Sequence, residues 1–537
     1  MITYEQAQVR LRDMKAERSN WESLWRDVAS YVLPRRLKEE ERTSGQNLYS
    51  LMYDSTAERA NNRLAAVIQS MLTNPSSRWF SLKVNNPALM EDEATLEWLE
   101  ANRDIALQLM SDSNFSQAAD ELYLDIGAIG TGVMLVSEGR NKPLHFQTLP
   151  IYECYLAEND EGIVDTLYRE YSMTVWQFVQ KFGDATPAFI MEKYKARRFE
   201  DRHKVLHVIE PREGVPKVPS NSKEFPYASY YFSADTGELL HEGGYKTFPA
   251  VCPRWRKASG EVYGRGPGLE ALADIKTLNE MVYSNLMAAH RAVEPPLDVE
   301  EDAYTDTLNL SPNAINYRQK QYNRAQPLYT VQGLAVSLEM QEAYRRLINE
   351  SFFYQQLTLI ENDRMTATEV MQRTEENMRI LGPTFGRFQS EFLEPLIRRT
   401  LQILDDRGLL YPAPDFIRNA GVIVEYESPL ARAQKSSELQ AIQQAILITA
   451  PIAQVKPDVI DIVKWDDIVR DLFLLNGVEQ KRLRTQKEVE AIRQQRQQQQ
   501  LAMYAMSQLE SMAKAAKQAS QAKPEEGLLG QVLGNAE

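Results

Sequence analysis

The feature that most constrains the fold of this sequence is a pair of long amphipathic segments separated by a short insert without a helical pattern. In the first segment, residues 264–296, apolar side chains recur every three or four positions and define one helix face: Leu269, Leu272, Ile275, Leu278, Val282, Leu286 and Ala289. Pro267 suits the first turn of this helix, and Pro295 with the proline that follows it ends the helix. A second helix is predicted over residues 333–356. Two helical rods therefore flank a small unit, residues 297–332, whose sequence is typical of strands and turns.

A third long helix is predicted after the second rod, and a polar loop, residues 357–366, leads into it. Thr366 and Glu369 have the spacing of a capping box, in which a hydroxyl and a carboxylate satisfy backbone N–H groups at a helix start. The Gly-Pro pair at residues 382–383 predicts a kink, because proline cannot donate to the helical hydrogen-bond ladder. We assign residues 367–430 to this kinked helix and a following strand.

The two ends of the chain differ in character. Residues 1–263 predict a mixed region with a first helix that buries Trp21 and Trp25, further helices, and short β-rich segments separated by turn signals. A capping-box pattern at Ser55–Glu58 marks the start of the second helix. Residues 431–537 predict helices, whose Gln-rich last part has little apolar stripe and needs neighbours to be stable. The fold class that we predict is α+β and mainly helical.

Length, charge and cysteine content narrow the classes of protein. A chain of 537 residues is too long for one core and predicts about three or four compact units. The net charge of -14 argues against a protein that grips nucleic acid through a broad basic face, but it is compatible with a surface past which nucleic acid slides. Cys154 and Cys252 match no disulfide or metal spacing and are expected to be buried thiols in a reducing compartment.

No segment of the sequence predicts a membrane protein or a secreted one. The longest apolar stretches fall short of the roughly 18 residues that a membrane span needs. The first residues are charged from Glu5 onward, unlike a signal peptide. We therefore expect a protein without a membrane span that is cytosolic or assembles in the cytosol.

The motifs of the sequence do not predict catalysis, a cofactor or a metal. The glycine-rich stretches 127–132 and 264–268 lack the order and spacing of a phosphate loop and are expected to form a tight turn and a hinge, respectively. His203 and His207 are four residues apart, but the alternation around them predicts a strand, which would separate them by about 13 Å. The acidic clusters are typical of solvated surface. We expect no catalytic residue, no metal site and no cofactor, and a protein that is not an enzyme.

The insert between the rods contains a basic patch with aromatic neighbours. Arg318, Lys320 and Arg324 lie in "YRQKQYNR" and are candidates for docking a protein or a nucleic acid. An ordinary solvated strand pair explains the same residues equally well.

The order of these parts resembles that of portal proteins, the head-to-tail connectors of short-tailed bacteriophages. The resemblance is carried by "EVYGRGPGLEALADIKTLNEMVYSN" before and within the first rod, by "NDRMTATEVMQRTEEN" before and within the kinked helix, and by "RWFSLKV" and "NFSQAADELYLDIGAIGTGVMLV" near the N-terminus. It implies a portal fold with these parts: residues 1–263 as a wing, 264–296 and 333–356 as stem helices, 297–332 as a clip, 357–366 as a tunnel loop, 367–430 as a kinked wing helix with its strand, and 431–537 as a helical crown that can extend as a C-terminal barrel.

The resemblance also implies an assembly and its partners. Portal proteins form a ring, usually of about twelve subunits, at one capsid vertex, and a separate terminase drives double-stranded DNA through the ring. By that resemblance Asn362, Asp363 and Arg364 face the DNA channel, and the clip docks the terminase and then the tail adaptor. The major capsid and scaffolding proteins would be further partners, and the protein would reside in the virion after assembly in the host cytoplasm. The alternative is a ring-forming or coiled-coil structural scaffold without a DNA channel, which explains the rods but not the β insert between them.

Overall fold

The computed structural model describes residues 2–36, 52–75, 77–86, 89–90, 92–216, 219, 221–304, 307, 309, 315–327, 334–353, 382–414, 422–426, 442, 444–449, 451, 464–475, 482–484 and 486–521. The chain divides into two compact units. One comprises Met1–Asn86 and Trp98–Gln434, and the other comprises Pro87–Glu97 and Lys435–Glu537.

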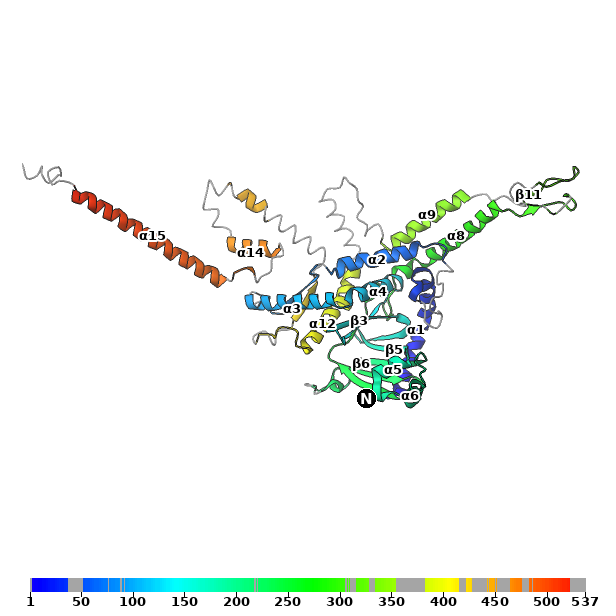
Figure 1. Ribbon diagram of the computed structural model, residues 1–537, viewed down its shortest axis with the longest axis horizontal. Coiled ribbons are helices and arrows are strands. Elements are labelled where there is room, and N and C mark those ends of the chain that lie inside the picture. Colours follow the sequence, from blue (N-terminus) through cyan, green and yellow to red (C-terminus); the bar gives the residue numbers. More distant parts are fainter. Residues whose placement is uncertain are drawn as a thin grey trace, which may run out of the picture. The chain divides into compact units, whose positions relative to one another are not determined.

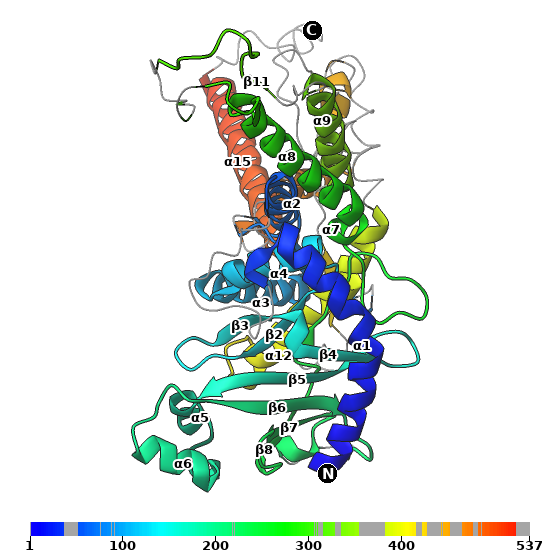
Figure 2. The same cartoon turned by 90° about the vertical axis from the view of Figure 1, so that its right-hand side faces the viewer.

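A five-stranded antiparallel sheet with the strand order β4-β5-β6-β7-β8 organises the first unit. Its strands are β4 (Cys154–Glu158), β5 (Val164–Thr174), β6 (Arg202–Pro211), β7 (Tyr227–Ser233) and β8 (Leu239–Tyr245). Helix α1 (Tyr4–Val32) packs on this sheet through Ala7, Leu11 and Met14, which join one buried cluster with Tyr168 and Leu206 (Figure 2). The first three of these strands and α1 confirm the sequence prediction, and Trp21 and Trp25 are buried on α1 as expected.

A second apolar cluster lies between this sheet and two short helices, α5 (Val175–Phe182) and α6 (Ala188–Lys195). Phe178 and Ile190 of the helices pack with Val205 of β6, which is adjacent in sequence to Leu206 of the α1 cluster. Because successive side chains of a strand point to opposite faces, the sheet is covered on both faces. Helix α5 ends at Gly183, which has φ 52°.

The first unit also contains a three-stranded sheet with the strand order β3-β2-β9. Its strands are β2 (Val133–Glu138), β3 (Leu144–Leu149) and β9 (Ala250–Val251), and β2 and β3 were predicted. Helices α4 (Phe115–Ala128) and α12 (Glu394–Asp406), which are far apart in the sequence, both contact this sheet. Helix α4 accepts a hydrogen bond at the Ala118 carbonyl from the Thr148 hydroxyl of β3, at 2.6 Å. Arg399 of α12 donates to the Val136 carbonyl of β2, at 3.4 Å.

Helices α2 (Thr56–Leu72) and α3 (Glu93–Asp112) confirm two further predictions, but the predicted capping box before α2 is wrong. Ser55 makes no side-chain hydrogen bond to the helix start. The carboxylate of Asp54 accepts from the Thr56 N–H instead, at 2.8 Å. The Asp54 carboxylate therefore satisfies the free N–H group of Thr56, whereas the Ser55 hydroxyl was expected to satisfy that of Glu58.

The two rods form an antiparallel helix pair. The first begins with α7 (Pro267–Glu270), breaks at Ala271 and continues as α8 (Leu272–Val293), and the second is α9 (Leu334–Ser351). Figure 1 shows α8 and α9 side by side, with the insert at their far end. There the short strands β10 (Leu297–Asp298) and β11 (Gln326–Pro327) pair, as a strand-and-turn insert predicts.

The strand predicted after the kinked helix closes a long-range pair. β1 (Phe80–Val84) pairs antiparallel with β12 (Val422–Tyr426), so that Phe80 lies opposite Tyr426. Both strands were predicted from their alternation.

The described part of the kinked helix contains a π-turn that sequence analysis missed. Residues 382–388 are α-helical, Gln389–Leu393 form a π-helix, and α12 follows. The Glu394 N–H donates to the Gln389 carbonyl five residues back. Pro395 explains the turn, because its ring nitrogen has no N–H for the Glu391 carbonyl four residues earlier. The predicted loop 357–366 and the capping box at Thr366 lie outside the described residues.

The second unit contains α14 (Trp465–Leu475) and α15 (Gln486–Gln521). Arg493 of α15 donates to the Asp466 carboxylate through its two terminal guanidinium nitrogens, Nη1 and Nη2, at 2.6 and 2.7 Å. The large apolar side chains of α15 are exposed: Leu501, Met503, Tyr504, Met506, Leu509 and Met512. This agrees with the prediction that the Gln-rich tail is helical and has too weak an apolar stripe to bury by itself.

Candidate functional site

The helix pair α8–α9 exposes apolar side chains along its length. Tyr283, Leu286 and Met287 are exposed and lie three and four positions apart, so they share one face of α8. Further exposed apolar residues are Val293 on α8 and Leu338, Met340 and Leu347 on α9. A patch of this kind on a long helix pair is typical of a surface that another protein chain covers.

Polar contacts fix the helices of this pair to each other. The Ser337 hydroxyl donates to the Asn285 side-chain oxygen at 2.8 Å, and the Gln341 amide donates to the Met281 carbonyl at 3.3 Å. At the base of the pair, the Asp54 carboxylate that caps α2 also accepts two hydrogen bonds from Arg345 of α9, both at 3.1 Å. The pair therefore has a defined orientation relative to α2.

The insert at the far end of α8 and α9 brings the three predicted basic residues into one turn. Arg318 forms an isolated antiparallel bridge with Tyr304 and donates to the Tyr322 carbonyl. Arg318, Lys320 and Arg324 are all exposed, and none pairs with a carboxylate within the described part of the chain. The insert also exposes the acidic residues Asp298, Glu300, Glu301 and Asp302, so the three cations lie in a region of mixed charge.

The two glycine-rich stretches of the sequence pack against each other. A Cβ atom built on Gly130, which has φ +96°, would lie 2.1 Å from the Gly266 backbone nitrogen, and one on Gly268 would lie 2.6 Å from the Ala128 carbonyl oxygen. The Gly264 N–H donates to the Thr131 hydroxyl at 2.8 Å. The turn predicted at residues 127–132 is confirmed. The glycines of 264–268 make close backbone contact where the chain enters α7, and the hinge predicted there stays a prediction.

A buried arginine joins three distant segments beside the π-turn. Arg254 is 2% exposed. Its Nε and Nη2 donate to the two carboxylate oxygens of Glu391 in the π-helix, at 3.0 and 2.7 Å, and its backbone N–H donates to the same carboxylate at 3.1 Å. Its Nη1 also pairs with Glu158 at the end of β4. The Lys257 ammonium donates to both carboxylate oxygens of Glu158, at 2.5 and 2.7 Å.

The carboxylates of this cluster keep the Arg254 guanidinium charged. Burial acts to lower the pKa of Arg254, but the hydrogen bonds and charges of Glu391 and Glu158 outweigh it, and the net effect raises the pKa. The cluster therefore fixes the helix of residues 382–406 to the loop that precedes α7 and to β4. Sequence analysis missed Arg254 and Glu391, whereas Pro395 within a helical stripe was a usable signal for the irregular turn.

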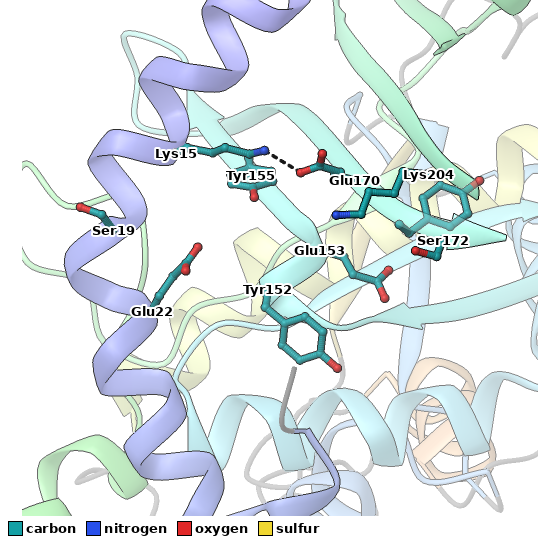
Figure 3. Close-up of a pocket in the computed structure, with 10 residues that line it drawn as sticks. Lys15, Ser19, Glu22, Tyr152, Glu153, Tyr155, Glu170, Ser172 and Lys204 are labelled. Atoms are coloured by element: carbon teal, nitrogen blue, oxygen red, sulfur yellow. Dashed lines mark hydrogen bonds and ion pairs between the residues drawn. The ribbon is translucent and has the colours of Figure 1, made fainter. Parts of the chain in front are cut away.

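A groove of about 470 Å³ lies between α1 and the five-stranded sheet (Figure 3). Its carboxylates already have partners. Lys15 donates to Glu170 at 2.6 Å, Glu153 accepts from Arg169 at 3.0 Å, and Glu22 pairs with Arg18 at 2.6 Å. The Lys15–Glu170 pair joins α1 to the sheet, whereas the other two pairs lie within α1 or within the sheet region, and the paired carboxylates do not form a set that converges on a substrate.

The histidines and cysteines singled out in the sequence have structural surroundings. His203 Nδ1 contacts Asp235 at 2.7 Å, whereas His207 contacts the Ser229 hydroxyl at 3.0 Å, and both lie on strand β6 as predicted. Cys154 and Cys252 are buried free thiols, as predicted, and burial raises the pKa of Cys154 to about 12. Among the described residues, no group of three His, Cys, Asp or Glu side chains could hold a metal ion.

The predicted loop residues Asn362, Asp363 and Arg364 lie outside the described residues. No helix within the described ranges is both long and apolar enough to cross a membrane.

Comparisons with known proteins extend along most of the chain. A family model described as bacteriophage head to tail connecting protein matches residues 4–483. A "Probable portal protein" of Bordetella phage BPP-1 is 30% identical over 500 residues, which cover 90% of this chain and 89% of the relative. A "Portal protein" of Salmonella phage epsilon15 is 29% identical over 498 residues, with the same coverage of 90% and 89%.

Among solved structures, a chain from the virion of a native gene transfer agent particle matches with a TM-score of 0.34 and 10% identity. The match covers 77% of this chain and 94% of that chain. That score does not establish a shared fold.

Proposed function

Because this chain belongs to the family of bacteriophage head-to-tail connecting proteins, we propose that it closes into a ring at one capsid vertex and forms the channel for double-stranded DNA. Its function is that of a portal protein, a structural component of the phage head-to-tail connection. The observation that carries the proposal is the family match over residues 4–483, together with two portal relatives aligned over 90% of the chain.

The subunit contacts of the ring would involve the stem, which is the helix pair α8–α9. The exposed Tyr283, Leu286 and Met287 of α8 are apolar side chains that a neighbouring copy would remove from water. Because more than half of each residue's surface is already buried, its burial by a neighbouring copy would contribute less than the roughly 1.5–3 kcal/mol of a fully exposed apolar side chain. A ring of about twelve copies provides the same neighbour for every subunit, so that no stem face stays uncovered.

The channel function is supported by charge. A ring of chains that each carry -14 is strongly acidic, and an acidic channel would repel the DNA phosphates, so that the duplex passes without tight binding. In this proposal Arg364 makes a transient, screened contact with the DNA backbone, while Asn362 and Asp363 keep the tunnel loop polar. Residues 357–366 are the tunnel loop.

The clip, residues 297–332, is the proposed docking surface for the terminase during packaging and for the tail adaptor afterwards. Arg318, Lys320 and Arg324 are exposed there and carry charge without carboxylate partners among the described residues. We expect the major capsid and scaffolding proteins as further partners during assembly in the host cytoplasm, before the protein becomes part of the virion.

The packaging role is tested by particles assembled with Arg364→Ala or Asp363→Ala. We expect these particles to form but to package or retain less DNA than wild-type particles. If particles of both variants package and retain DNA like wild-type particles, residues 362–364 line the channel without acting on the DNA.

A ring-forming scaffold without a channel is the competing function. Such a scaffold would support particle assembly whether or not these loop residues were changed, and DNA would not pass through it. The family match to head-to-tail connecting proteins favours the portal function over this alternative.

A further inference from the structure

The outer edge of β8 is open over part of its length, and the short helix η6 (Ser222–Glu224) packs against the strand near Gly244. β8 is the last strand of the five-stranded sheet, and within the described part of the chain its backbone bonds to β7 and, at Gly243, to the Arg212 side chain. The opposite edge differs, because Arg18 donates to the Cys154 carbonyl at 2.7 Å and the Leu156 N–H donates to the Tyr263 hydroxyl at 3.2 Å. An open edge strand is a template to which an extended segment of another chain can add.

A pocket of about 330 Å³ adjoins this edge strand. The residues that line it come from α5, β7, β8 and the turn before β7, and they include Lys181, Ser229, Tyr231, His241 and Tyr245. None of the lining residues carries a carboxylate. The volume suits one side chain or a small planar group.

Aromatic side chains position the Lys181 ammonium at this pocket through cation–π contacts. The Lys181 ammonium lies 4.1 Å from the ring centre of Tyr231 and 5.5 Å from that of Phe182, and it donates to the Tyr171 hydroxyl at 3.1 Å. Tyr231 is itself stacked on the buried His207, with ring centres 3.8 Å apart. The charge is therefore positioned by a rigid aromatic wall, although the Lys181 side chain remains exposed to solvent.

The charge at this pocket is not compensated. Lys181 forms no ion pair with a carboxylate in the described ranges, and the nearby charges that act on it are those of Arg169 and Arg140. Arg399 lies 5.2 Å from the Tyr245 ring, is 6% exposed and donates to neutral oxygens of Val136 and Thr247. Desolvation by the surrounding rings and these positive neighbours lower the pKa of Lys181 to about 8, which leaves it protonated at neutral pH.

We propose that the β8 edge and this pocket bind an extended acidic segment of a partner protein, whose backbone pairs with β8 and whose carboxylate side chain reaches Lys181. A carboxylate would supply the counter-ion that the pocket lacks, and hydrogen bonds to charged groups are the stronger ones. Gly243, which has no side chain, lets such a group approach between Ser229 and His241. This inference does not depend on the ring or the channel.

Charge around the pocket favours a segment with isolated acidic residues over a nucleic acid. Glu242 lies on β8 itself and pairs with Lys223 at 3.2 Å, Glu238 immediately precedes this strand, and Glu224 lies in η6, which packs against it. These carboxylates would repel a continuous phosphate backbone. In an extended peptide, side chains alternate between the faces, so one carboxylate can enter the pocket while its neighbours point away from it.

The test is a binding measurement on the full chain with two fluorescent pools of ten-residue peptides. Both pools vary Thr, Val, Ser and Tyr, and one has Glu fixed at a central position where the other has Gln. We expect the Glu pool to bind about tenfold more tightly than the Gln pool, because the difference is one charge-assisted hydrogen bond. Hydrogen exchange should slow at the amides of residues 239–245 when the Glu pool is added.

Three variants make the measurement specific. Lys181→Gln should reduce binding of the Glu pool to that of the Gln pool, Lys181→Arg should retain most of it, and Lys195→Gln, at an exposed lysine of α6, should leave it unchanged. Equal binding of the two pools, or protection elsewhere than β8, would overturn the proposal. Binding of an eight-residue oligothymidylate through Lys181, with no binding of either peptide pool, would assign the pocket to nucleic acid and also overturn it.

Discussion

At the scale of single residues, the buried guanidinium of Arg254 ties together segments that lie more than ninety residues apart in sequence. Glu158 comes from β4 and Glu391 from the π-turn, and both carboxylates direct oxygens to the same side chain. Removal of the arginine would leave the partly buried Glu391 carboxylate with the distant Arg387, at 3.9 Å, whereas Glu158 would keep Lys257. A buried charge that loses its close counter-ion is among the costliest defects in a protein interior.

We therefore expect Arg254→Met to lower the free energy of unfolding by about 3 kcal/mol, as urea unfolding followed by tryptophan fluorescence would measure. The matched control is Arg493→Met, which breaks the exposed ion pair with Asp466 and should cause no measurable loss. Equal losses in the two variants would contradict the role given to the buried cluster.

His207 provides a prediction about pH. Burial, and then the charges of Lys181, Arg169 and His241, lower its pKa well below 6.5, so the folded chain keeps the imidazole neutral. The unfolded chain binds a proton below about pH 6.5, and the stability that His207 contributes is therefore lost as the pH falls below that value, by up to about 1.4 kcal/mol per unit.

His207→Gln removes this titration and retains a donor for Ser229. We expect the difference in the free energy of unfolding between wild type and this variant to shift against wild type from pH 7 to pH 5. Parallel pH profiles for the two proteins would refute the neutral buried state of His207.

At the scale of elements, the junction of the two glycine-rich stretches sets where α7 begins. Gly130→Ala would place a methyl group against the Gly266 backbone and would also force a residue with a side chain to φ +96°. We expect a loss of about 3 kcal/mol in the free energy of unfolding. Gly386→Ala is the control, because it is helical and nothing lies within 4 Å of its added Cβ, and we expect a gain of up to about 1 kcal/mol. Losses in both variants would show that glycine is required for another reason.

Hydrophobic periodicity predicted most of the described elements. Phe388, Phe392 and Leu396 are buried along the predicted stripe, and the alternation of the short strands identified β1 to β6 and β12. These predictions succeeded because one buried face imposes a period on the local sequence. The break at Ala271 and the π-turn at Pro395 were missed because they interrupt the period only locally.

Contacts between distant segments could not be predicted in the same way. Nothing in the sequence near Arg254 specifies that Glu158 and Glu391 are its partners, and nothing near Gly130 specifies Gly266. The cap at Asp54 replaced the expected Ser55 because that carboxylate also receives Arg345 from α9, a contact that depends on tertiary structure. The predicted loop residues 362–364 lie outside the described residues and remain predictions.

At the scale of the whole molecule, the exposed apolar face of α8 is the element on which the proposed ring depends. Leu286→Glu would place a charge in the proposed subunit contact, where burial of an unpaired carboxylate costs several kcal/mol. We expect this variant to elute as smaller species than wild type in size-exclusion chromatography with light scattering. Glu280→Gln, an exposed change on the same helix, should assemble like wild type. Normal assembly of Leu286→Glu would exclude this face from the subunit contact.

The central claim is that copies of this chain close into a ring around a channel that passes duplex DNA. Native mass spectrometry of the purified wild-type protein, combined with electron microscopy of the same sample, tests it most directly. We expect a closed ring of about twelve copies with a central pore wide enough for duplex DNA. A monomer, or an open assembly without a pore, would contradict it.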